Sequence, residues 1–387
     1  MSYGTRSWKV EYFFKGLSIG IILSNVISVR VTRTLKAKTN KLELVLHNRN
    51  GVAMEDGVIK YKPDEVIKVY AANGDVDTSN SAHLIGTFQI LDGSFDAKTN
   101  TVKLNCIDKT YNMLSKLYVG DENAPVNEII ENIVQTINEN GETITPIRTH
   151  IASTRSDNTP FPTKTYTSVY KTAYDAITEL SQIDYTEDSR EYIFWFDENN
   201  EFYWVYPDDD DTPSQTFKLG YEPVLEMKLK KSESETISMV IYNAGNDKND
   251  NAWLGYYLDP FATSIKNRML YQPMIDISRD LKAELIRNGT YDTISNEDYV
   301  EILDNRAKAR ARSIVSKVGQ GLWEADIDIR GEKYTPGTIY GVDASKLGLG
   351  TLNLRLTRVV HIMDRNGWLT KLTLKEDPEK LELWGEK

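Results

Sequence analysis

Histidine, the side chain that most often binds metals or moves protons in proteins, is sparse in this sequence. No two histidines stand at the spacing of an HExxH motif or of another metal-ligand motif. Each is therefore predicted to be a surface or core-packing residue, and no metal site is expected. The four residues are His47, His83, His150 and His361.

Cys106 is the only cysteine, so the chain has no internal disulfide and no site built from cysteines alone. It alternates with Val102 and Leu104, which predicts a buried structural thiol rather than a reactive one. A GxSxG elbow is lacking, and Gly319-Gln320-Gly321 is without the rest of a dinucleotide or phosphate motif. We therefore predict no catalytic residue and no cofactor, and expect that the chain is not an enzyme.

The densest acidic run is Asp208–Asp211, and carboxylates at close spacing are the ligands that calcium prefers. An EF-hand loop starting at Asp208 would put Pro213 where glycine is required and Leu219 where a bidentate glutamate is required. The motif therefore fails, and a solvated linker is the better interpretation.

Arg306, Lys308, Arg310 and Arg312 form the one basic cluster, which could contact nucleic acid. On a helix these charges fan around the axis, and Asp304 can pair with Lys308 at i,i+4, so a solvated face is favoured.

The aromatic residues between Tyr192 and Tyr206 could stack on sugars or bases. Cross-strand aromatic pairs also stabilise hairpins, and that interpretation is favoured.

Length and charge limit the classes of function. The 387 residues are enough for two to four domains, and 40% of them are hydrophobic. A net charge of −11 argues against a surface that grips duplex DNA or an anionic membrane. The only apolar stretch near the start, residues 17–27, is too short to span a bilayer and lacks a cleavage pattern. We expect synthesis in the cytoplasm, no membrane insertion and no tight binding of nucleic acid.

Strand periodicity dominates both ends of the chain. Residues 42–47 and 102–106 alternate apolar and polar side chains, as do residues 325–330 and 352–357. The turn Asp364–Gly367 contains Asn-Gly, which tolerates the positive φ of a tight hairpin, and residues 368–374 return from it.

Two segments near opposite ends resemble one another. Lys60-Tyr61-Lys62-Pro63 corresponds to Lys333-Tyr334-Thr335-Pro336, with an offset in numbering of 336 − 63 = 273. Further on, Asp96 and Leu104 correspond to Asp364 and Leu372, with an offset of 364 − 96 = 268. We predict two similar β-modules in which each proline begins a strand, because proline is tolerated at a strand's first residue. Chance similarity between proline-started amphipathic strands is the alternative. Two unlike folds, or a merger of the two regions into one sheet, would remove the support for an assembly that uses two equivalent modules per subunit.

Helical periodicity marks the middle of the chain. Residues 126–137 form a helix between Pro125 and Gly141, and a second helix is predicted from Ser168 to about Ile183. A third is expected from Ser295, where Asp298 completes a weak capping box, to about Gly319. Domain joints are expected at residues 117–125 and 207–214.

The predicted fold class is α+β, with two similar small antiparallel β-barrels and α/β domains inserted between them. The predicted domains are a first β-barrel at 1–116, an α/β domain with an aromatic hairpin at 117–213, a second α/β region ending in a long helix at 214–319, and a second β-barrel at 320–387.

This order of elements resembles the tail or baseplate hub family of tailed phages and related contractile injection systems, which includes the late control D proteins and Tal-type hubs. The residues that carry the resemblance are the strand Asn40–Asn48, the step Tyr61–Val66, residues 102–108, the helix 173–181 and the closing segment 331–374. Residues 243–273 do not align with the family pattern.

The resemblance implies a homotrimer in which two barrels per subunit form a pseudo-sixfold ring. Such a ring joins a hexameric tail tube to a trimeric central spike or tail-tip protein, and DNA or effectors pass through it. Other baseplate proteins and a tape measure protein are further implied partners, and the implied location is the virion tail. A tail-associated peptidoglycan hydrolase, using paired carboxylates, and a carbohydrate-binding β-module remain as alternatives.

Overall fold

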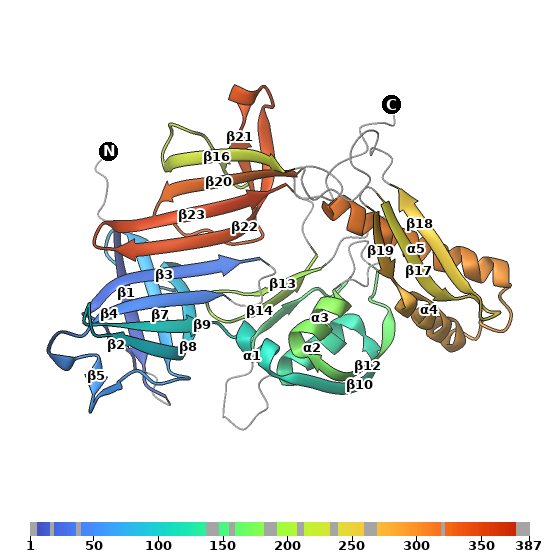
Figure 1. The fold of residues 1–387 in the computed structure, drawn as a ribbon, viewed down its shortest axis with the longest axis horizontal. Coiled ribbons are helices and arrows are strands. Elements are labelled where there is room, and N and C mark those ends of the chain that lie inside the picture. The colour runs from blue at the N-terminus through green and yellow to red at the C-terminus, as the bar shows by residue number, and fades with distance from the viewer. Residues whose placement is uncertain are drawn as a thin grey trace.

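The computed structural model describes residues 6–15, 19–35, 40–136, 147–154, 159–181, 192–206, 213–232, 239–258, 269–318 and 322–376. It contains one large sheet, built from both ends of the chain, and two smaller α/β units from the middle (Figure 1). The fold is thus strand-rich α+β, as predicted.

The large sheet has 13 strands. Its N-terminal strands are β1 (Arg6–Phe13), β2 (Ile21–Ile22), β3 (Val26–Thr34), β4 (Lys41–His47), β7 (Val66–Asn73), β8 (Leu84–Asp96) and β9 (Thr101–Ile107). The others are β15 (Thr216–Phe217), β16 (Val224–Ser232), β20 (Leu322–Arg330), β21 (Ile339–Asp343), β22 (Thr351–Asp364) and β23 (Gly367–Lys375). A separate small hairpin joins β5 (Met54–Glu55) to β6 (Val58–Ile59).

Alternating residues explain why these segments are strands. Leu42, Leu44 and Leu46 are fully buried, whereas the residues between them are not. The same period buries Ala325, Ile327 and Ile329 in β20. A period of two places one apolar set on one face of the sheet, where its burial stabilises the strand.

Two groups of five strands repeat the same topology. The first copy is ordered β3-β4-β9-β8-β7, and the second copy is ordered β16-β20-β23-β22-β21. In both copies the strands follow the same order along the chain. The predicted duplication is therefore present in the strand order.

The registers of the two copies also agree. A β-bulge interrupts β8 at Leu91 and β22 at Thr357, an offset in numbering of 357 − 91 = 266. Another interrupts β3 at Ile27 and β16 at Leu225, an offset of 225 − 27 = 198. Because a bulge shifts every later side chain relative to its partner strand, matched bulges show matched registers.

The proline step is equivalent in the two copies but precedes the strands. β7 and β21 begin three residues after Pro63 and Pro336, so the expectation that each proline is the first strand residue is wrong. Between proline and strand, Asp64 (φ 68°) and Gly337 (φ 96°) both adopt a left-handed conformation that allows the tight step. The strand starts differ by 339 − 66 = 273, which agrees with the sequence match.

The hairpin ends differ in length. Asp96 pairs with Thr101 as Ile362 pairs with Leu369, so Asp96 corresponds to Ile362 and not to Asp364. The second hairpin therefore extends two pairs further.

The two copies are not separate. β22 pairs with β3, which joins both copies into one continuous sheet, and the described strands do not close into a barrel. The expectation of two separate small barrels is therefore not borne out. The physical reason is that β21 covers only residues 351–355 of one edge of β22, so residues 358–363 of that edge are free to pair with β3.

The first α/β unit follows the first copy. It contains α1 (Thr110–Ser115), β10 (Leu117–Pro125), α2 (Val126–Thr136), β11 (Thr149–Ile151), β12 (Thr163–Thr172), α3 (Ala173–Leu180), β13 (Ile193–Phe196) and β14 (Phe202–Val205). The helix at 126–136 and the aromatic hairpin are confirmed, while Ile137 and Gly141 lie outside the described residues.

Two segments of this unit differ in structure from what the sequence pattern indicates. Residues 117–125, where a domain joint is expected, form strand β10, which pairs with β12. The second helix begins at Ala173 and not at Ser168, because Thr172 caps it and the preceding residues, rich in threonine and tyrosine, belong to β12.

The second α/β unit is inserted between β16 and β20, where the first copy has only a short connection between β3 and β4. It contains β17 (Met239–Asn246), β18 (Ala252–Leu258), β19 (Met269–Pro273), α4 (Ile275–Arg287) and α5 (Asn296–Val318). Both helices pack on one face of its sheet (Figure 1).

Sequence reasoning found α5 but missed α4. Ser295 caps α5 as predicted, because its hydroxyl accepts from the backbone N–H of Asp298 at 3.0 Å and donates to the Asp298 carboxylate at 2.7 Å. The predicted unit 214–319 divides, since β15 and β16 belong to the large sheet. Residues 243–246 and 252–258, which the family pattern left unaligned, lie in β17 and β18.

Candidate assembly site

The pairing of β3 with β22, called here the internal seam, is the most informative contact in the molecule. It runs antiparallel over six residue pairs, from Arg358–Thr34 to Met363–Val29. Val31 and Val359 on its inner face are fully buried. Met363 and Trp368, at the end of the second copy's hairpin, pack into the hydrophobic core of the first copy. The seam therefore locks the copies together by backbone pairing and by side-chain burial.

His361 is buried in the internal seam. Its Nδ1 lies 3.0 Å from the hydroxyl of Thr370 and accepts a hydrogen bond of 3.2 Å from the indole N–H of Trp368. Burial, with Arg33 and Lys333 nearby, lowers the pKa of His361 to about 3, so the ring is neutral at ordinary pH. It is a core-packing residue, which is one of the two roles that the sequence left open for the histidines.

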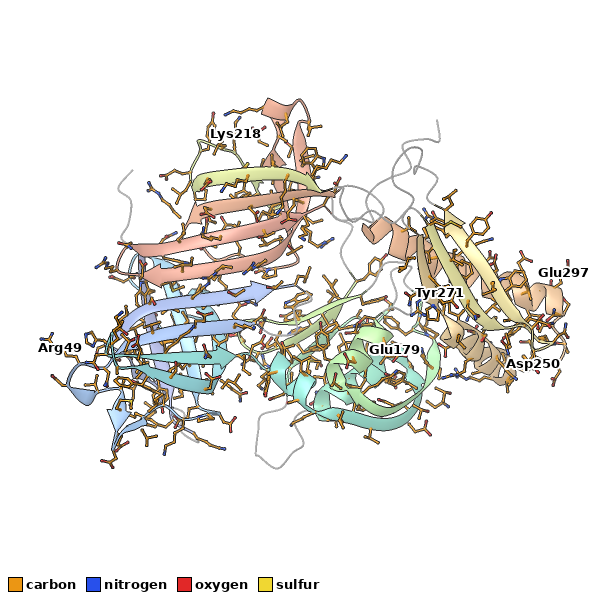
Figure 2. All side chains as sticks on the ribbon, in the orientation of Figure 1. Arg49, Glu179, Lys218, Asp250, Tyr271 and Glu297 are labelled. Carbon is orange, nitrogen blue, oxygen red and sulfur yellow. The ribbon has the colours of Figure 1, made fainter. Side chains whose placement is uncertain are left out.

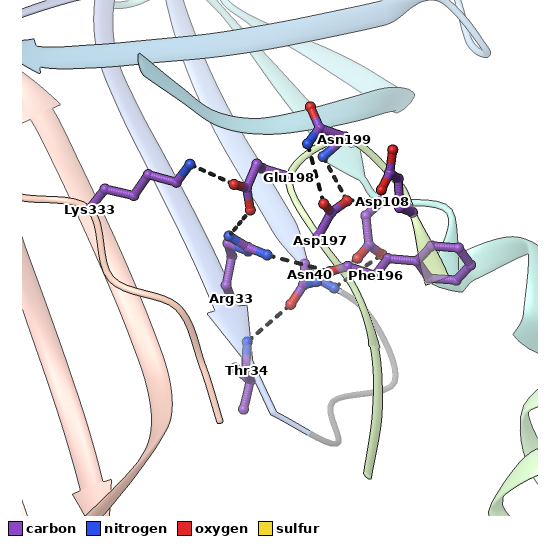
Figure 3. Close-up of polar contacts among 10 residues, drawn as sticks. Arg33, Thr34, Asn40, Asp108, Phe196, Asp197, Glu198, Asn199 and Lys333 are labelled. Atoms are coloured by element: carbon purple, nitrogen blue, oxygen red, sulfur yellow. Dashed lines mark hydrogen bonds and ion pairs between the residues drawn. The ribbon is translucent and has the colours of Figure 1, made fainter. Parts of the chain in front are cut away.

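An ion cluster holds the aromatic hairpin against both copies, with Arg33 buried and Glu198 and Lys333 half-buried (Figure 3). The carboxylate of Glu198, in the turn between β13 and β14, contacts Arg33 of the first copy at 3.2 Å and Lys333 beside the second copy at 2.5 Å. Arg33 also donates to the backbone oxygen of Phe196 at 3.4 Å. Burial alone would raise the pKa of Glu198, but the two cations outweigh it and hold that pKa below its usual value.

A second buried polar pair ties the turn after β3 to the end of β9. The side-chain amide of Asn40 donates to Asp108 at 2.5 Å and accepts from the backbone N–H of Thr34 at 3.0 Å. Complete burial raises the pKa of Asp108 to about 6, although hydrogen bonds from Thr110 and Asn40 act in the opposite direction. Figure 3 shows this pair beside the ion cluster.

The remaining histidines lie apart from one another. His47 and His150 are exposed, and His83 accepts from the backbone N–H of Asp77 at 3.1 Å. His150 stacks on Tyr203 with 4.3 Å between ring centroids and lies 2.8 Å from Glu201. Among the described residues, no group of three or more His, Cys, Asp or Glu side chains is placed to hold a metal ion.

The other chemical candidates are structural where the chain is described. Cys106 is buried, and burial raises the pKa of its thiol well above the usual value. Lys308 pairs with Asp304 at 2.6 Å, as predicted, and Arg306 pairs with Glu284 at 2.9 Å. The acidic run at 208–211 and the glycines at 319–321 lie outside the described residues.

The aromatic hairpin packs against itself. Tyr192 stacks on Trp204 at 4.1 Å and Trp195 stacks on Tyr203 at 5.1 Å between centroids. The indole N–H of the fully buried Trp204 donates to Ser181 at 2.9 Å. The favoured interpretation, cross-strand packing, is confirmed.

Sequence reasoning missed Arg33, Glu198 and Lys333. A signal existed for Arg33, since it continues the inward phase of Val29 and Val31, and a charge at such a position needs a buried partner. No local pattern identifies Glu198 as that partner, because the two lie far apart in the sequence.

In the described part of the chain, no helix is both long and apolar enough to cross a membrane.

No protein-family model and no curated protein sequence matches this chain. Solved structures do. The tail protein from Neisseria meningitidis has a TM-score of 0.64 at 13% identity, with 96% of this chain and 97% of that chain covered. The 43 kDa tail protein of prophage MuSo2 from Shewanella oneidensis has a TM-score of 0.61 at 11% identity, with 97% and 99% covered. This chain has the fold of phage tail proteins.

The likeness extends to a secretion system. An Escherichia coli component of the type VI secretion system, described as structurally similar to the phage T4 tail proteins gp27 and gp5, has a TM-score of 0.51 at 10% identity. The match covers 95% of this chain and 76% of that one. Phage tail and secretion proteins thus share this fold at very low sequence identity.

Proposed function

We propose that this chain is a structural subunit of a phage tail or a related injection machine. Specifically, three copies form a hub ring that joins a hexameric tail tube to a trimeric central spike or tail-tip protein. The observation that carries the proposal is the duplicated five-strand topology, because three subunits with two equivalent copies each present six similar units. The shared fold with tail proteins over 96% of the chain supports it.

The joined sheet changes how such a ring is built. Two separate barrels would have supported a pseudo-sixfold ring directly, and the merger through β22 and β3 removes that support. The proposal of six similar units therefore depends on the equal strand order and the equal bulges. These make the two copies equivalent even though the described strands of neither copy form a closed barrel by themselves.

The charge balance suits a conduit. A trimer carries 3 × (−11) = −33 formal charges, so its surface repels phosphate rather than binding it. The proposal also includes passage of DNA or an effector through the ring and contact with other baseplate proteins or a tape measure protein. It further includes assembly in the host cytoplasm and a location in the virion tail.

Light scattering coupled to size exclusion tests the proposal. We expect a mass of three times 44.1 kDa and ring-shaped particles by electron microscopy. The same sample should show no release of sugars or peptides from peptidoglycan and no binding of duplex DNA at physiological salt.

A monomer at micromolar concentration, in both low and moderate salt, would contradict the hub. Cell-wall turnover would favour the hydrolase alternative, and steeply salt-dependent DNA binding would give the 306–312 helix a function.

A further inference from the structure

The first copy has an open edge at the place where the second copy has the internal seam. In β22, residues 358–362 lie between β23 and β3. The equivalent residues of β8, 92–96, pair with β9 alone, and all five are exposed. Strand β16, the equivalent of β3, pairs with β20 alone and ends the sheet. One chain therefore carries both halves of a second seam, at opposite ends of its sheet.

The β5–β6 hairpin does not occupy this edge as a strand partner. Its Ile59 packs over the face of β8, beside Gly93 and Leu104, and β5 and β6 pair only with one another. Covering a face leaves the backbone edge available to another strand.

The internal seam predicts the register of the second seam. The residue of β8 that is equivalent to a residue of β22 has a number lower by 266. The residue of β16 that is equivalent to a residue of β3 has a number higher by 198. The pair His361–Val31 thus becomes Phe95–Leu229, and Ile362–Arg30 becomes Asp96–Lys228. Val360–Thr32 becomes Ser94–Lys230.

The chemistry of the two edges is complementary in that register. Phe95 is 42% exposed, and the conversion places it opposite the apolar Leu229 on the inner face. Asp96 then lies opposite Lys228 on the outer face. Its pKa is already lowered by hydrogen bonds from Thr99 and Lys98, so its carboxylate is charged. Opposite charges facing one another across an antiparallel pair stabilise it, whereas a shift of one residue would put Asp96 opposite Leu229.

We propose that the β8 edge of one subunit pairs antiparallel with the β16 edge of the next, in the register Phe95–Leu229 and Asp96–Lys228. The occupant of each edge is a second copy of this chain. Each subunit offers one edge of each kind, so the contact is head-to-tail and propagates around a ring. This inference rests on the proposed trimeric hub and names the surface that closes it. Three internal seams then alternate with three seams between subunits.

Engineered disulfides test the register. Two double variants, Phe95→Cys with Leu229→Cys and Ser94→Cys with Lys230→Cys, are oxidised with diamide, which accepts the electrons and protons of the two thiols. Neighbouring pairs alternate between narrow and wide spacing, so one of the two variants has the narrow geometry that a disulfide needs. The native Cys106 is buried and does not compete. We expect a covalent trimer, with no larger species.

An off-register variant is the matched control. Phe95→Cys with Leu225→Cys places the second thiol four residues along β16, about 13 Å from the first. We expect about tenfold less cross-linking in this variant than in the better in-register pair. Thermal melting verifies that each variant is folded.

The outcomes separate the inference from the proposed function. A trimer by light scattering in which neither in-register pair cross-links faster than the control would overturn the seam and leave the hub standing. A monomer throughout would overturn both. Cross-linked chains longer than three would support the strand pairing and contradict the closed trimer.

Discussion

The two five-strand copies share order, register and bulges, but they differ where the sheet ends. In the second copy the hairpin tip carries Met363 and Trp368, which are buried in the first copy's core. The equivalent tip of the first copy carries Ala97 and Asn100, which are exposed. The backbone arrangement is therefore the same in both copies, whereas the side chains at the tip depend on whether the edge is covered within the chain. Figure 2 shows how the side chains cover the joined sheet.

The copies also differ in the length of the connection between their first two strands. Residues 35–40 connect β3 to β4, whereas residues 233–321, with a complete α/β unit, connect β16 to β20. Closing a longer connection costs little more entropy than closing a short one, so such an insertion leaves the strand pairing intact. The inserted unit has its own hydrophobic core and does not need the sheet to bury its apolar residues.

The largest expected effect on stability comes from the tip of the β22–β23 hairpin, which packs into the core of the first copy beside the internal seam. Trp368→Ala removes a side chain that is 6% exposed, and we expect a loss of about 3–5 kcal/mol in the free energy of unfolding. Asn100→Ala, at the equivalent position of the first copy, should cost less, about 1–2 kcal/mol, because this exposed side chain contributes only its hydrogen bonds to Asn48 and a φ of 50° that alanine adopts poorly. Urea unfolding measures both. Equal losses would show that the two tips do not differ in the way described.

Equivalent core positions should respond alike. Leu104 and Leu372 are buried at matching sites of β9 and β23, so alanine at either should cost about 2–5 kcal/mol by urea unfolding. The double variant should lose the sum within about 0.5 kcal/mol, since the two sites belong to different core clusters. A strongly non-additive result would mean that the copies share one core.

The ion cluster joins the hairpin to both copies, so one substitution affects two contacts. Glu198→Gln leaves Arg33 buried without its carboxylate, and we expect a loss of about 2–3 kcal/mol in the free energy of unfolding. Glu201→Gln, which weakens the contacts with the exposed Arg148 and His150, should cost less than about 1 kcal/mol. Similar losses from the two variants would show that the ion cluster is no stronger than exposed pairs.

Acid should weaken the internal seam through His361. Its pKa is about 3 in the fold and near 6.5 when unfolded, so the unfolded chain binds the proton first. The stability it contributes is complete above about pH 6.5 and is lost as the pH falls towards 3. His361→Phe, which installs the residue found at the equivalent Phe95, should flatten this dependence in urea titrations across that range.

Asp108 should affect the pH dependence of stability in the direction opposite to His361, so it serves as a control. Its pKa is raised to about 6, so its contribution is complete below about pH 3.8 and is lost as the pH rises through 6. Asp108→Asn should therefore remove a rise in stability on acidification. If both variants changed the pH dependence in the same direction, the described environments would be incorrect.

The smallest expected effect concerns the charges at the open edges. Lys228→Glu should raise the dissociation constant of the assembled ring a few-fold, because an exposed pair contributes about 0.2–1 kcal/mol. Asp96→Lys in the same chain should restore assembly. Sedimentation at low salt measures the effect, which should shrink as salt screens the charges. Failure of the second change to restore assembly would count against this register.

Local sequence patterns determined much of this fold. Alternation identified the core strands of both copies, and the 3.6-residue period with its capping signals identified α2 and α5, because each pattern depends only on neighbouring residues. The match of Tyr61 and Pro63 with Tyr334 and Pro336 indicated the duplication, and its offset agrees with the observed registers of β7 and β21. Burial of Cys106 followed from the same alternation, whereas for His361 the sequence left surface exposure and core packing equally open.

How these elements meet depends on contacts between segments that are distant in the sequence. Residues 168–172 are a strand because β10 lies beside them, which a helical spacing of apolar residues could not reveal. The choice of Glu198 as the partner of Arg33, and of β22 as the partner of β3, joins segments that are distant in the sequence. Strand edges carry the same backbone donors and acceptors whatever the sequence, so the pattern of side chains identifies a strand but does not say which edge it pairs with.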